Sequence, residues 1–413
     1  MSKSFGLLGE KLGHSFSPLI HSCLGDYQYR LYEVPPDGLD SFMTERNFDG
    51  INVTIPYKQD VMDYCETLSD EARAIGCVNT IIKDKNGDLH GYNTDYYGFK
   101  TMLEHGNINP KRKKVLVLGN GGSAKTVRAV LNYSGAEEII TVSRLGENNY
   151  SNIAKHHDAE LIINTTPVGM YPNNGTAPVC IKGFKQLTGV ADLIYNPART
   201  KLIMDAERLG ISCVSGLSML IAQAKRASML FNGESYRELD IKNIISKILR
   251  ETQNIAIIGM PGCGKSSVGR ALAAMTDKPF SDIDMLVEAS SGRCIPEIFA
   301  KSGEEVFRKM ETRALSEESK KSGQIIATGG GIVTIPENLD LLRQNSFIVY
   351  LKRDLNELNI IGRPLSDSIG IKTLAKQRLP LYEAWSDCVV EAGESIEQTA
   401  TRIISATKKE ETT

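Results

Sequence analysis

The sequence has 413 residues, which is enough for two or three domains of ordinary size and excludes a single small module. Hydrophobic residues make up 41% of the chain and charged residues 24%, both typical of globular proteins, and a formal net charge of -2 gives no reason to expect nucleic acid or an anionic membrane as a partner. We therefore expect ligands that are small molecules.

The eight cysteines are scattered, and no two of them have Cys-x-x-Cys spacing, which favours reduced thiols over disulfides or zinc. The first ten residues lack a basic segment followed by an apolar run, and no apolar stretch of 18 residues occurs. These features predict a cytoplasmic protein that is not exported.

Short apolar runs alternate with stretches of helical spacing from the start of the chain, a pattern that is typical of an α/β fold. The expected strands are residues 5–8, 29–34 and 50–54, and the expected helices are residues 18–24 and 39–46.

Four turns between these elements are rich in hydroxyl and amide groups, and they also contain one Lys and one Asp. The turns are residues 14–18, 52–58, 77–80 and 93–95. Because ligands of open α/β sheets bind at strand ends, such a set of side chains suits a polyhydroxylated acid. The alternative for any one turn is that its polar groups only cap helices and build the turn.

A buried strand at residues 115–119 leads into Gly-Asn-Gly-Gly-Ser-Ala at residues 119–124, and a helical stretch continues to Tyr133. This matches G-x-G-x-x-[GA] between a strand and a helix, which indicates a dinucleotide site. The next strand, residues 139–142, is followed by Arg144, where an NAD-binding protein usually has an acid for the ribose. An Arg can pair with a 2′-phosphate, so NADP is favoured; the alternative is a solvated arginine at a strand end.

Three further strands complete a doubly wound cofactor domain. They are residues 161–164, 190–193 and 211–214. The helical stretch 218–231 carries Gln223 among apolar residues and is expected to pack back on the first domain. Residues 235–251 are helical and charged, and they lead into the next strand with hardly any linker.

Residues 259–266, Gly-Met-Pro-Gly-Cys-Gly-Lys-Ser, match the phosphate-binding pattern G-x-x-x-x-G-K-[ST]. A strand at 254–258 precedes them and a helix at 267–275 follows, which is the required order; the alternative is a Gly-rich turn that matches by chance. In this motif Lys265 reaches the β and γ phosphates and the Ser266 hydroxyl holds Mg²⁺.

Residues 280–284 are expected to form a strand that ends in two acids, Asp282 and Asp284, one for the metal's water shell and one for a substrate hydroxyl. A helix is expected to open at 303–308, and a strand at 325–327 runs into three glycines that would let a ligand lie against bare backbone. Two later arginines, Arg363 and Arg378, are expected to be spaced by a helix and to converge on a carboxylate and a transferring phosphoryl group. The alternative is that they are surface residues.

Residues 1 to about 245 resemble shikimate dehydrogenase along their whole length. The family's Ser-x-Ser-Pro turn, Asn-Val-Thr-x-Pro-x-Lys, Val-Asn-Thr and Asn-Thr-Asp motifs occur in order, and a late helix carries a Gln. The resemblance implies that Lys58 and Asp95 are the catalytic pair. It implies that shikimate is held by Ser15, Ser17, Asn52, Thr54, Asn79, Tyr195 and Gln223. It implies that the cofactor is held by Gly119, Asn120, Gly121, Gly122, Ser123, Arg144, Leu193 and Gly216.

Two features depart from that family's pattern. A second basic residue usually follows the strand-end Arg by about four positions, whereas this chain has Glu147 and Asn148. This favours a weaker selection of NADP. The stretch from Arg144 to Asn164 is also short, so we expect one crossover helix to be trimmed.

Residues 252–413 resemble shikimate kinase along their full length. The resemblance places Mg²⁺ at Ser266 and Asp282, and shikimate at Asp284, Arg308, Gly330 and Arg378. It implies ATP contacts from Gly262, Cys263, Gly264, Lys265, Ser266 and Ser267, with Arg363 in a lid over ATP. The stretch 351–363 is several residues shorter than usual, lacks the earlier lid arginine, and is followed by Ser366 where a second Leu is common.

Together these features predict an α/β protein with an α/β substrate domain and a Rossmann-like NADP domain, followed by a phosphate-loop kinase domain with a parallel sheet. The expected boundaries are 1–105 for the substrate domain, completed by helices within 217–250, then 106–216 for the NADP domain and 252–413 for the kinase domain.

The expected activity is a two-step synthesis of shikimate 3-phosphate: NADPH reduces 3-dehydroshikimate to shikimate, and ATP with Mg²⁺ then phosphorylates shikimate. One alternative is a quinate dehydrogenase that uses NAD. Another is that the second half is a shikimate-binding or nucleotide-sensing module with little kinase activity.

Overall fold

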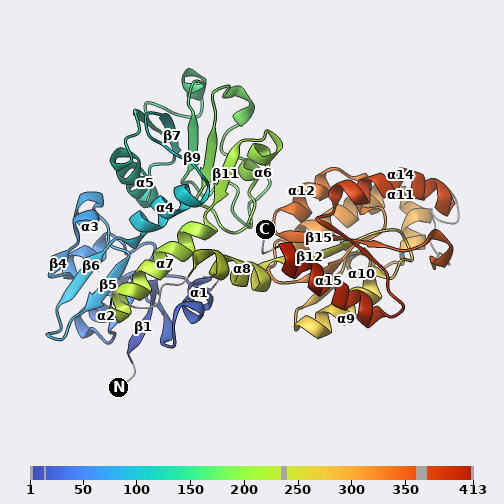
Figure 1. Ribbon diagram of the computed structural model, residues 1–413, viewed down its shortest axis with the longest axis horizontal. Coiled ribbons are helices and arrows are strands. Elements are labelled where there is room, and N and C mark those ends of the chain that lie inside the picture. The colour runs from blue at the N-terminus through green and yellow to red at the C-terminus, as the bar shows by residue number, and fades with distance from the viewer. Residues whose placement is uncertain (1–2, 14, 234–239, 360–369, 411–413) are drawn as a thin grey trace. The chain divides into compact units, whose positions relative to one another are not determined.

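The structure, a computed structural model, describes residues 3–13, 15–233, 240–359 and 370–410. The chain forms two compact units, Met1–Ile248 and Leu249–Thr413 (Figure 1). In the described part of the chain no helix is both long and apolar enough to cross a membrane.

The first unit begins with a mixed sheet in the order β2-β1-β3-β5-β6-β4, in which β5 pairs antiparallel with both β3 and β6. Its strands are β1 (Ser4–Gly9), β2 (Gln28–Glu33), β3 (Gly50–Val53), β4 (Thr67–Leu68), β5 (Thr80–Lys83) and β6 (Leu89–Tyr92). Its helices are α1 (Ser17–Leu24), α2 (Leu39–Glu45) and α3 (Asp70–Ile75), with 3₁₀ turns at Pro36–Gly38 and Asp60–Tyr64. The apolar runs of β1 and β3 are buried because the parallel β1 lies between two other strands.

The second sheet of this unit is fully parallel, in the order β11-β10-β9-β7-β8. Its strands are β7 (Lys114–Leu118), β8 (Glu138–Val142), β9 (Leu161–Asn164), β10 (Gly189–Asp192) and β11 (Ser212–Ser215). The helices α5 (Gly122–Tyr133) and α6 (Lys201–Arg208) accompany it, with 3₁₀ turns at Ile153–His156 and Ile181–Gly183. Only a 3₁₀ turn connects β8 to β9, which confirms the trimmed crossover.

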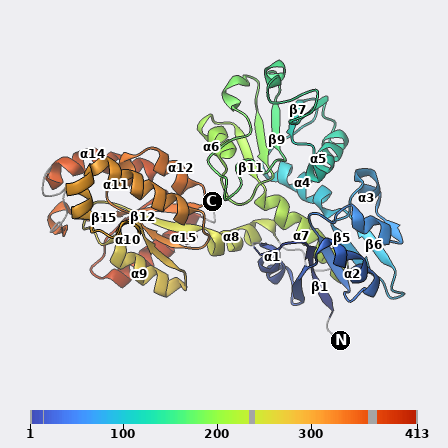
Figure 2. The same cartoon turned by 180° about the vertical axis from the view of Figure 1, so that it is seen from behind.

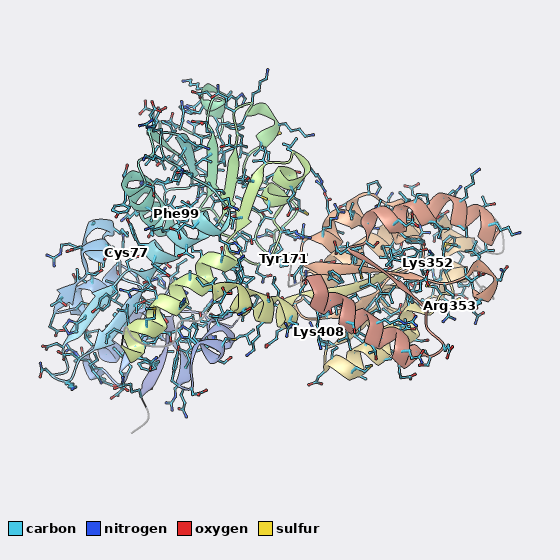
Figure 3. The ribbon with its side chains drawn as sticks, viewed as in Figure 1. Cys77, Phe99, Tyr171, Lys352, Arg353 and Lys408 are labelled. Atoms are coloured by element: carbon cyan, nitrogen blue, oxygen red, sulfur yellow. The ribbon has the colours of Figure 1, made fainter. Side chains whose placement is uncertain are left out.

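Two helices, α4 (Thr94–His105) and α7 (Leu217–Asn232), lie side by side between the two sheets in both views (Figures 1 and 2). Their backbones approach closely, because a Cβ on Gly98 would lie 2.8 Å from the carbonyl oxygen of Met219. Phe99 of α4, labelled in Figure 3, belongs to the apolar core of the second sheet. At the other end, the rings of Phe231 on α7 and Phe5 on β1 stack at 4.5 Å. The expected packing of α7 on the first domain is therefore confirmed.

The second unit has a five-stranded parallel sheet in the order β13-β14-β12-β15-β16. Its strands are β12 (Asn254–Ile258), β13 (Phe280–Asp282), β14 (Ile325–Ala327), β15 (Ser346–Lys352) and β16 (Cys388–Glu391). Its helices are α9 (Lys265–Thr276), α10 (Ile283–Ser291), α11 (Ile295–Ser319), α12 (Glu337–Arg343), α14 (Ile371–Trp385) and α15 (Ile396–Glu410), and α8 (Ile241–Thr252) leads into β12. The central β12 and β15 are buried along almost their whole length, as the apolar runs in both strands require.

One expectation for this unit was wrong in detail. Asp284 is not on a strand, because β13 ends at Asp282, whose side chain accepts a hydrogen bond from the Met285 N–H at 3.3 Å and so caps α10. α11 begins at Ile295, but Gly303, with a φ of 81°, breaks it into two helical parts, so the part that carries Arg308 opens at Gly303 as expected. Arg378 lies within α14, whose first residues precede it in the chain.

Candidate functional site

The first unit contains a cavity of about 460 Å³ whose walls include residues of the first sheet and residues that follow β10 and β11 of the second. The residues that the sequence predicted for substrate binding and catalysis all line this cavity. They are Ser15, Ser17, Asn52, Thr54, Lys58, Asn79, Asp95, Tyr195 and Gln223. Three of the residues predicted for the cofactor, Ser123, Leu193 and Gly216, also line it. The structure therefore brings together segments that are more than two hundred residues apart in the sequence.

Lys58 and Asp95 form an ion pair in this cavity, with Nζ 2.6 Å from Oδ2. Asp95 lies in the first turn of α4, where a negative side chain is favourable. Asn93 caps this helix by accepting a hydrogen bond from the Tyr96 N–H at 3.2 Å, and its amide donates to the Cys77 carbonyl at 3.0 Å. The two paired side chains are 25% and 15% exposed, so a ligand in the cavity can reach them.

The amides of Asn52 and Asn79 are held from behind the cavity. Asn52 accepts a hydrogen bond from the Tyr29 hydroxyl at 2.7 Å and donates to the Thr80 hydroxyl at 3.0 Å. Asn79 accepts a hydrogen bond from the Thr94 N–H at 2.7 Å. These contacts fix which atom of each amide a ligand meets, which is what selective binding of hydroxyl groups requires.

Gln223 and Tyr195 provide polar groups on other parts of the lining. The Gln223 amide donates to the Leu220 carbonyl at 2.9 Å and accepts a hydrogen bond from the Thr94 hydroxyl at 3.4 Å. The Tyr195 ring lies 5.4 Å from the ring of Phe16. Burial raises the pKa of Tyr195, so its hydroxyl stays protonated and can donate a hydrogen bond.

A buried histidine behind the cavity was missed by the sequence reasoning. His21 of α1 is 1% exposed, its ring stacks on Tyr29 at 3.8 Å, and its Nδ1 lies 2.7 Å from the Tyr27 hydroxyl. Burial lowers the pKa of His21 to about 3, although a hydrogen bond with Asn52 opposes the shift. The imidazole is therefore neutral and helps to position the residues around Asn52. Its signal in the sequence is a lone His on the apolar face of an amphipathic helix.

The glycine-rich loop after β7 has the geometry of a phosphate site. Gly119 has a φ of 105°, and a Cβ there would lie 2.7 Å from the Thr165 hydroxyl. Gly121 caps α5 without a side-chain hydrogen bond, and a Cβ on Gly121 or Gly122 would meet no atom within 4 Å. The space beside these two glycines is therefore open and no side chain caps the start of α5, which fits the pyrophosphate of a dinucleotide.

Arg144 follows the end of β8 and is exposed, and no carboxylate in the described residues forms an ion pair with it. The residue four positions later, Asn148, contacts nearby residues. Its Oδ1 lies 2.8 Å from Nε2 of His156, and its backbone carbonyl accepts a hydrogen bond from the Ser143 N–H at 3.0 Å. The structure thus leaves Arg144 as a cation at the place where the 2′-group of a dinucleotide is recognised.

In the second unit, β12, the phosphate-binding loop and α9 follow one another as predicted. Gly264 has a φ of 101°, and α9 begins after it without a side-chain cap. Lys265 is 7% exposed, and its Nζ donates to the carbonyls of Gly259 and Met260, both at 2.9 Å. The other predicted nucleotide contacts lie in this loop and the first turn of α9: Gly262, Cys263, Ser266 and Ser267. The uncapped helix and the adjacent ammonium fit a polyphosphate.

The predicted metal residues, Ser266 and Asp282, lie at the start of α9 and the end of β13, two elements that pack together. The described residues contain no group of three or more His, Cys, Asp or Glu side chains that could hold a metal. Mg²⁺ that enters with a nucleotide is held by one or two protein oxygens together with phosphate oxygens. A hydroxyl and a single carboxylate therefore fit this metal.

Charged side chains meet the three glycines after β14. A Cβ on Gly331 would lie 2.0 Å from Nη2 of Arg308, and a Cβ on Gly329 would lie 2.2 Å from Oε1 of Glu311 and 2.6 Å from Oδ1 of Asp284. Arg308 also pairs with Glu311 at 2.7 Å. Only glycine lets these charged groups approach the backbone so closely.

Glu311 was also missed by the sequence reasoning. It is fully buried, and burial raises its pKa to about 7 against the opposing effect of Arg308. Its signal is an acid three positions after Arg308 on the same helix, the spacing at which helical side chains meet.

Arg378 of α14 completes this cluster. It is 4% exposed, and it interacts electrostatically with Arg308 and with Tyr382, whose hydroxyl donates a hydrogen bond to the Gly330 carbonyl. Its Nε is buried and has no hydrogen-bond partner in the described residues. Two buried guanidinium groups beside bare backbone form a site for an anionic ligand. Arg363, predicted for the lid, lies outside the described residues.

Comparison with protein families gives two matches. The family model for the shikimate dehydrogenase substrate binding domain matches residues 7–81, and the model for shikimate kinase matches residues 261–408. These matches confirm both resemblances and the α/β fold class.

Individual relatives cover the first unit. The chain is 38% identical over 267 residues to a shikimate dehydrogenase (NADP(+)) of Clostridium perfringens, a match that covers 60% of this chain and 98% of the relative. Among solved structures it is similar to a chorismate mutase/shikimate 5-dehydrogenase fusion protein of Clostridium acetobutylicum, with a TM-score of 0.56, 36% identity, and coverage of 60% of this chain and 97% of the other. It is also similar to the shikimate 5-dehydrogenase of Thermus thermophilus in complex with NADP(H) and shikimate, with a TM-score of 0.54, 29% identity, and coverage of 59% and 97%.

Proposed function

Because the chain belongs to the shikimate dehydrogenase family, we propose that its first unit reduces 3-dehydroshikimate to shikimate with NADPH and that its second unit phosphorylates shikimate with ATP and Mg²⁺. The observation that carries the first part is the Lys58–Asp95 pair inside a cavity lined by neutral hydroxyl and amide groups. The second part rests on the cluster of arginine and carboxylate side chains at the glycines after β14, together with the phosphate-binding loop before α9. We also propose the three domains 1–105 with 217–250, 106–216, and 252–413.

In the first reaction, NADPH supplies the hydride that reduces the ring ketone. Lys58 Nζ, held by Asp95, stabilises the developing alkoxide and donates a proton to it. Asn52 and Asn79, whose amides are oriented by hydrogen bonds from behind the cavity, bind ring hydroxyls. Ser15 in the turn before α1 and Ser17, the first residue of α1, bind the carboxylate of the substrate. The hydroxyl and amide groups in the lining suit a substrate whose recognition depends on several hydroxyl groups.

In the second reaction, ATP supplies the phosphoryl group. Lys265 exchanges its hydrogen bonds to the loop carbonyls for bonds to phosphate oxygens, which neutralises negative charge. Asp284 orients the attacking hydroxyl of shikimate above Gly329, while Arg308 and Arg378 bind the carboxylate. Glu311 holds Arg308 in place through the 2.7 Å ion pair.

Two assays on the full chain test this proposal. We expect NADPH oxidation that depends on 3-dehydroshikimate, and ADP release from ATP that depends on shikimate. Lys58→Ala removes only the first activity and Lys265→Ala removes only the second, so each variant is the control for the other. ADP release that is absent, or that is unchanged by shikimate, contradicts the kinase assignment and favours a binding module instead.

A further inference from the structure

A second arginine is held at the edge of the dinucleotide site. Arg128 lies on α5, and its Nη1 donates a hydrogen bond to Oδ1 of Asn120 at 3.1 Å and to the hydroxyl of Thr141 at 3.3 Å. Asn120 belongs to the glycine-rich loop, and Thr141 is the second-last residue of β8. Helical side chains point back toward the helix N-terminus, which explains how a residue in the second turn of α5 reaches this loop. The guanidinium is thus fixed between the loop and β8.

No carboxylate in the part of the chain that the structure describes neutralises the charge of this guanidinium. Both acceptors, an amide oxygen and a hydroxyl, are neutral, and no ion pair of Arg128 occurs among the residues that the structure describes. Arg144, two residues beyond the end of β8, also lacks a carboxylate partner there. Two cations without counter-ions therefore flank the strand end at which a dinucleotide-binding fold holds the ribose 2′-group.

We propose that Arg128 is the second cation that selects the 2′-phosphate of NADPH, together with Arg144. The inference rests on the proposed use of NADPH and names a residue that supplies part of that selectivity. It also accounts for the absence of a basic residue after Arg144, because Glu147 and Asn148 stand there and Asn148 contacts His156. A guanidinium that is already oriented loses little freedom when it binds a phosphate.

Equilibrium binding of the oxidised cofactors tests the proposal without turnover. We would titrate the full-length wild type, Arg128→Gln and Arg128→Lys with NADP⁺ and with NAD⁺ by calorimetry. Removing a charged hydrogen-bond donor from a phosphate typically weakens binding roughly tenfold or more, so Arg128→Gln should lose about that much affinity for NADP⁺ and less than about twofold for NAD⁺. Arg128→Lys keeps the positive charge but lacks the forked donors of the guanidinium, so its affinity for NADP⁺ should lie between those of the wild type and Arg128→Gln.

Arg208→Gln is the matched control, because it makes the same charge change at the end of α6, which packs on β10 and β11 at the opposite edge of the sheet from β8. It should leave both affinities unchanged. The ratio of kcat/KM for NADPH to that for NADH should fall in Arg128→Gln in parallel with the binding ratio. Any adenine binding in the second unit is common to all four proteins and cancels in the comparison.

Two outcomes would overturn the proposal. If Arg128→Gln weakens NADP⁺ and NAD⁺ equally, the arginine only orders the loop through Asn120; if neither affinity changes, it has no part in cofactor binding. A wild type that binds NAD⁺ as tightly as NADP⁺ contradicts the proposed cofactor itself. By contrast, if the wild type prefers NADP⁺ and Arg128→Gln keeps the same preference, only the role of Arg128 is refuted.

Discussion

The buried His21 gives the first unit a stability that depends on pH. Burial lowers the pKa of His21 from 6.5 to about 3. The unfolded chain therefore takes up a proton near pH 6.5, whereas the folded chain takes it up only near pH 3. The stability that belongs to this group is complete above pH 6.5 and is lost as the pH falls toward 3. Between pH 8 and pH 5 the loss is about 2 kcal/mol, because each pKa unit of difference corresponds to 1.36 kcal/mol.

His21→Gln keeps a polar side chain and removes the titration, so the difference in unfolding free energy between wild type and variant should change by about 2 kcal/mol between pH 8 and pH 5. The difference is the quantity to measure, because Asp192 acts in the opposite direction. Burial raises the pKa of Asp192 to about 6, so its contribution is lost as the pH rises through 6. Asp192 is present in both proteins and cancels.

The assay is urea unfolding of the full chain at pH 5, 6, 7 and 8, followed by a deuterium pulse at one fixed pH and mass spectrometry of peptides from β1 and α1. The single tryptophan, Trp385, is buried in the second unit, and its fluorescence provides an internal control that should be the same in both proteins. A difference between wild type and variant that stays constant from pH 8 to pH 5 would show that His21 titrates alike in the folded and unfolded chain, contrary to this expectation.

Three further substitutions test a buried carboxylate of the first unit and the charged cluster of the second. In the wild type the raised pKa of Asp192 makes the folded state bind the proton more tightly, so the stability of the first unit falls between pH 4 and pH 7. Asp192→Asn should remove this fall, measured by the same deuterium pulse. An unchanged slope of stability against pH would argue against burial as the cause of the raised pKa. Glu311→Gln should raise the KM for shikimate in ADP release more than it lowers kcat, because the ion pair that positions Arg308 is lost, and the reverse split would place Glu311 in the chemical step. Gly331→Ala should reduce shikimate-dependent ADP release by at least tenfold, because a Cβ would lie 2.0 Å from the Arg308 guanidinium and displace it; unchanged release would show that Arg308 is not displaced.

The buried parallel strands could be predicted from the sequence because each is a short apolar run between turn residues. β9, β12 and β14 have the expected ends, and β7 and β8 differ by one residue. The β5–β6 hairpin was not predicted, although Asn86-Gly87 at its tip is a turn signal, because the strands are short and contain polar residues. The strand expected to include Asp284 was wrong because the capping hydrogen bond of Asp282 outweighs the alternation of apolar and polar residues.

The candidate sites were predicted where they lie in contiguous motifs. Lys58, Asp95 and Lys265 belong to short patterns whose spacing carries the chemistry. His21 and Glu311 could not be assigned in this way, because their burial depends on segments that meet only in the fold: α1 with β2 for His21, and α11 with the glycines after β14 for Glu311. Arg128 was missed for the same reason, since only the packing of α5 on β8 brings it to the loop.

Mass spectrometry of the products tests whether this one chain carries out two consecutive reactions. The purified full-length protein would be given 3-dehydroshikimate, NADPH, ATP and Mg²⁺ with no other enzyme. We expect shikimate 3-phosphate to form in the wild type, shikimate alone to accumulate in Lys265→Ala, and neither product to form in Lys58→Ala, which still phosphorylates added shikimate. A wild type that consumes NADPH and accumulates shikimate without any shikimate 3-phosphate would show that the second unit does not phosphorylate shikimate.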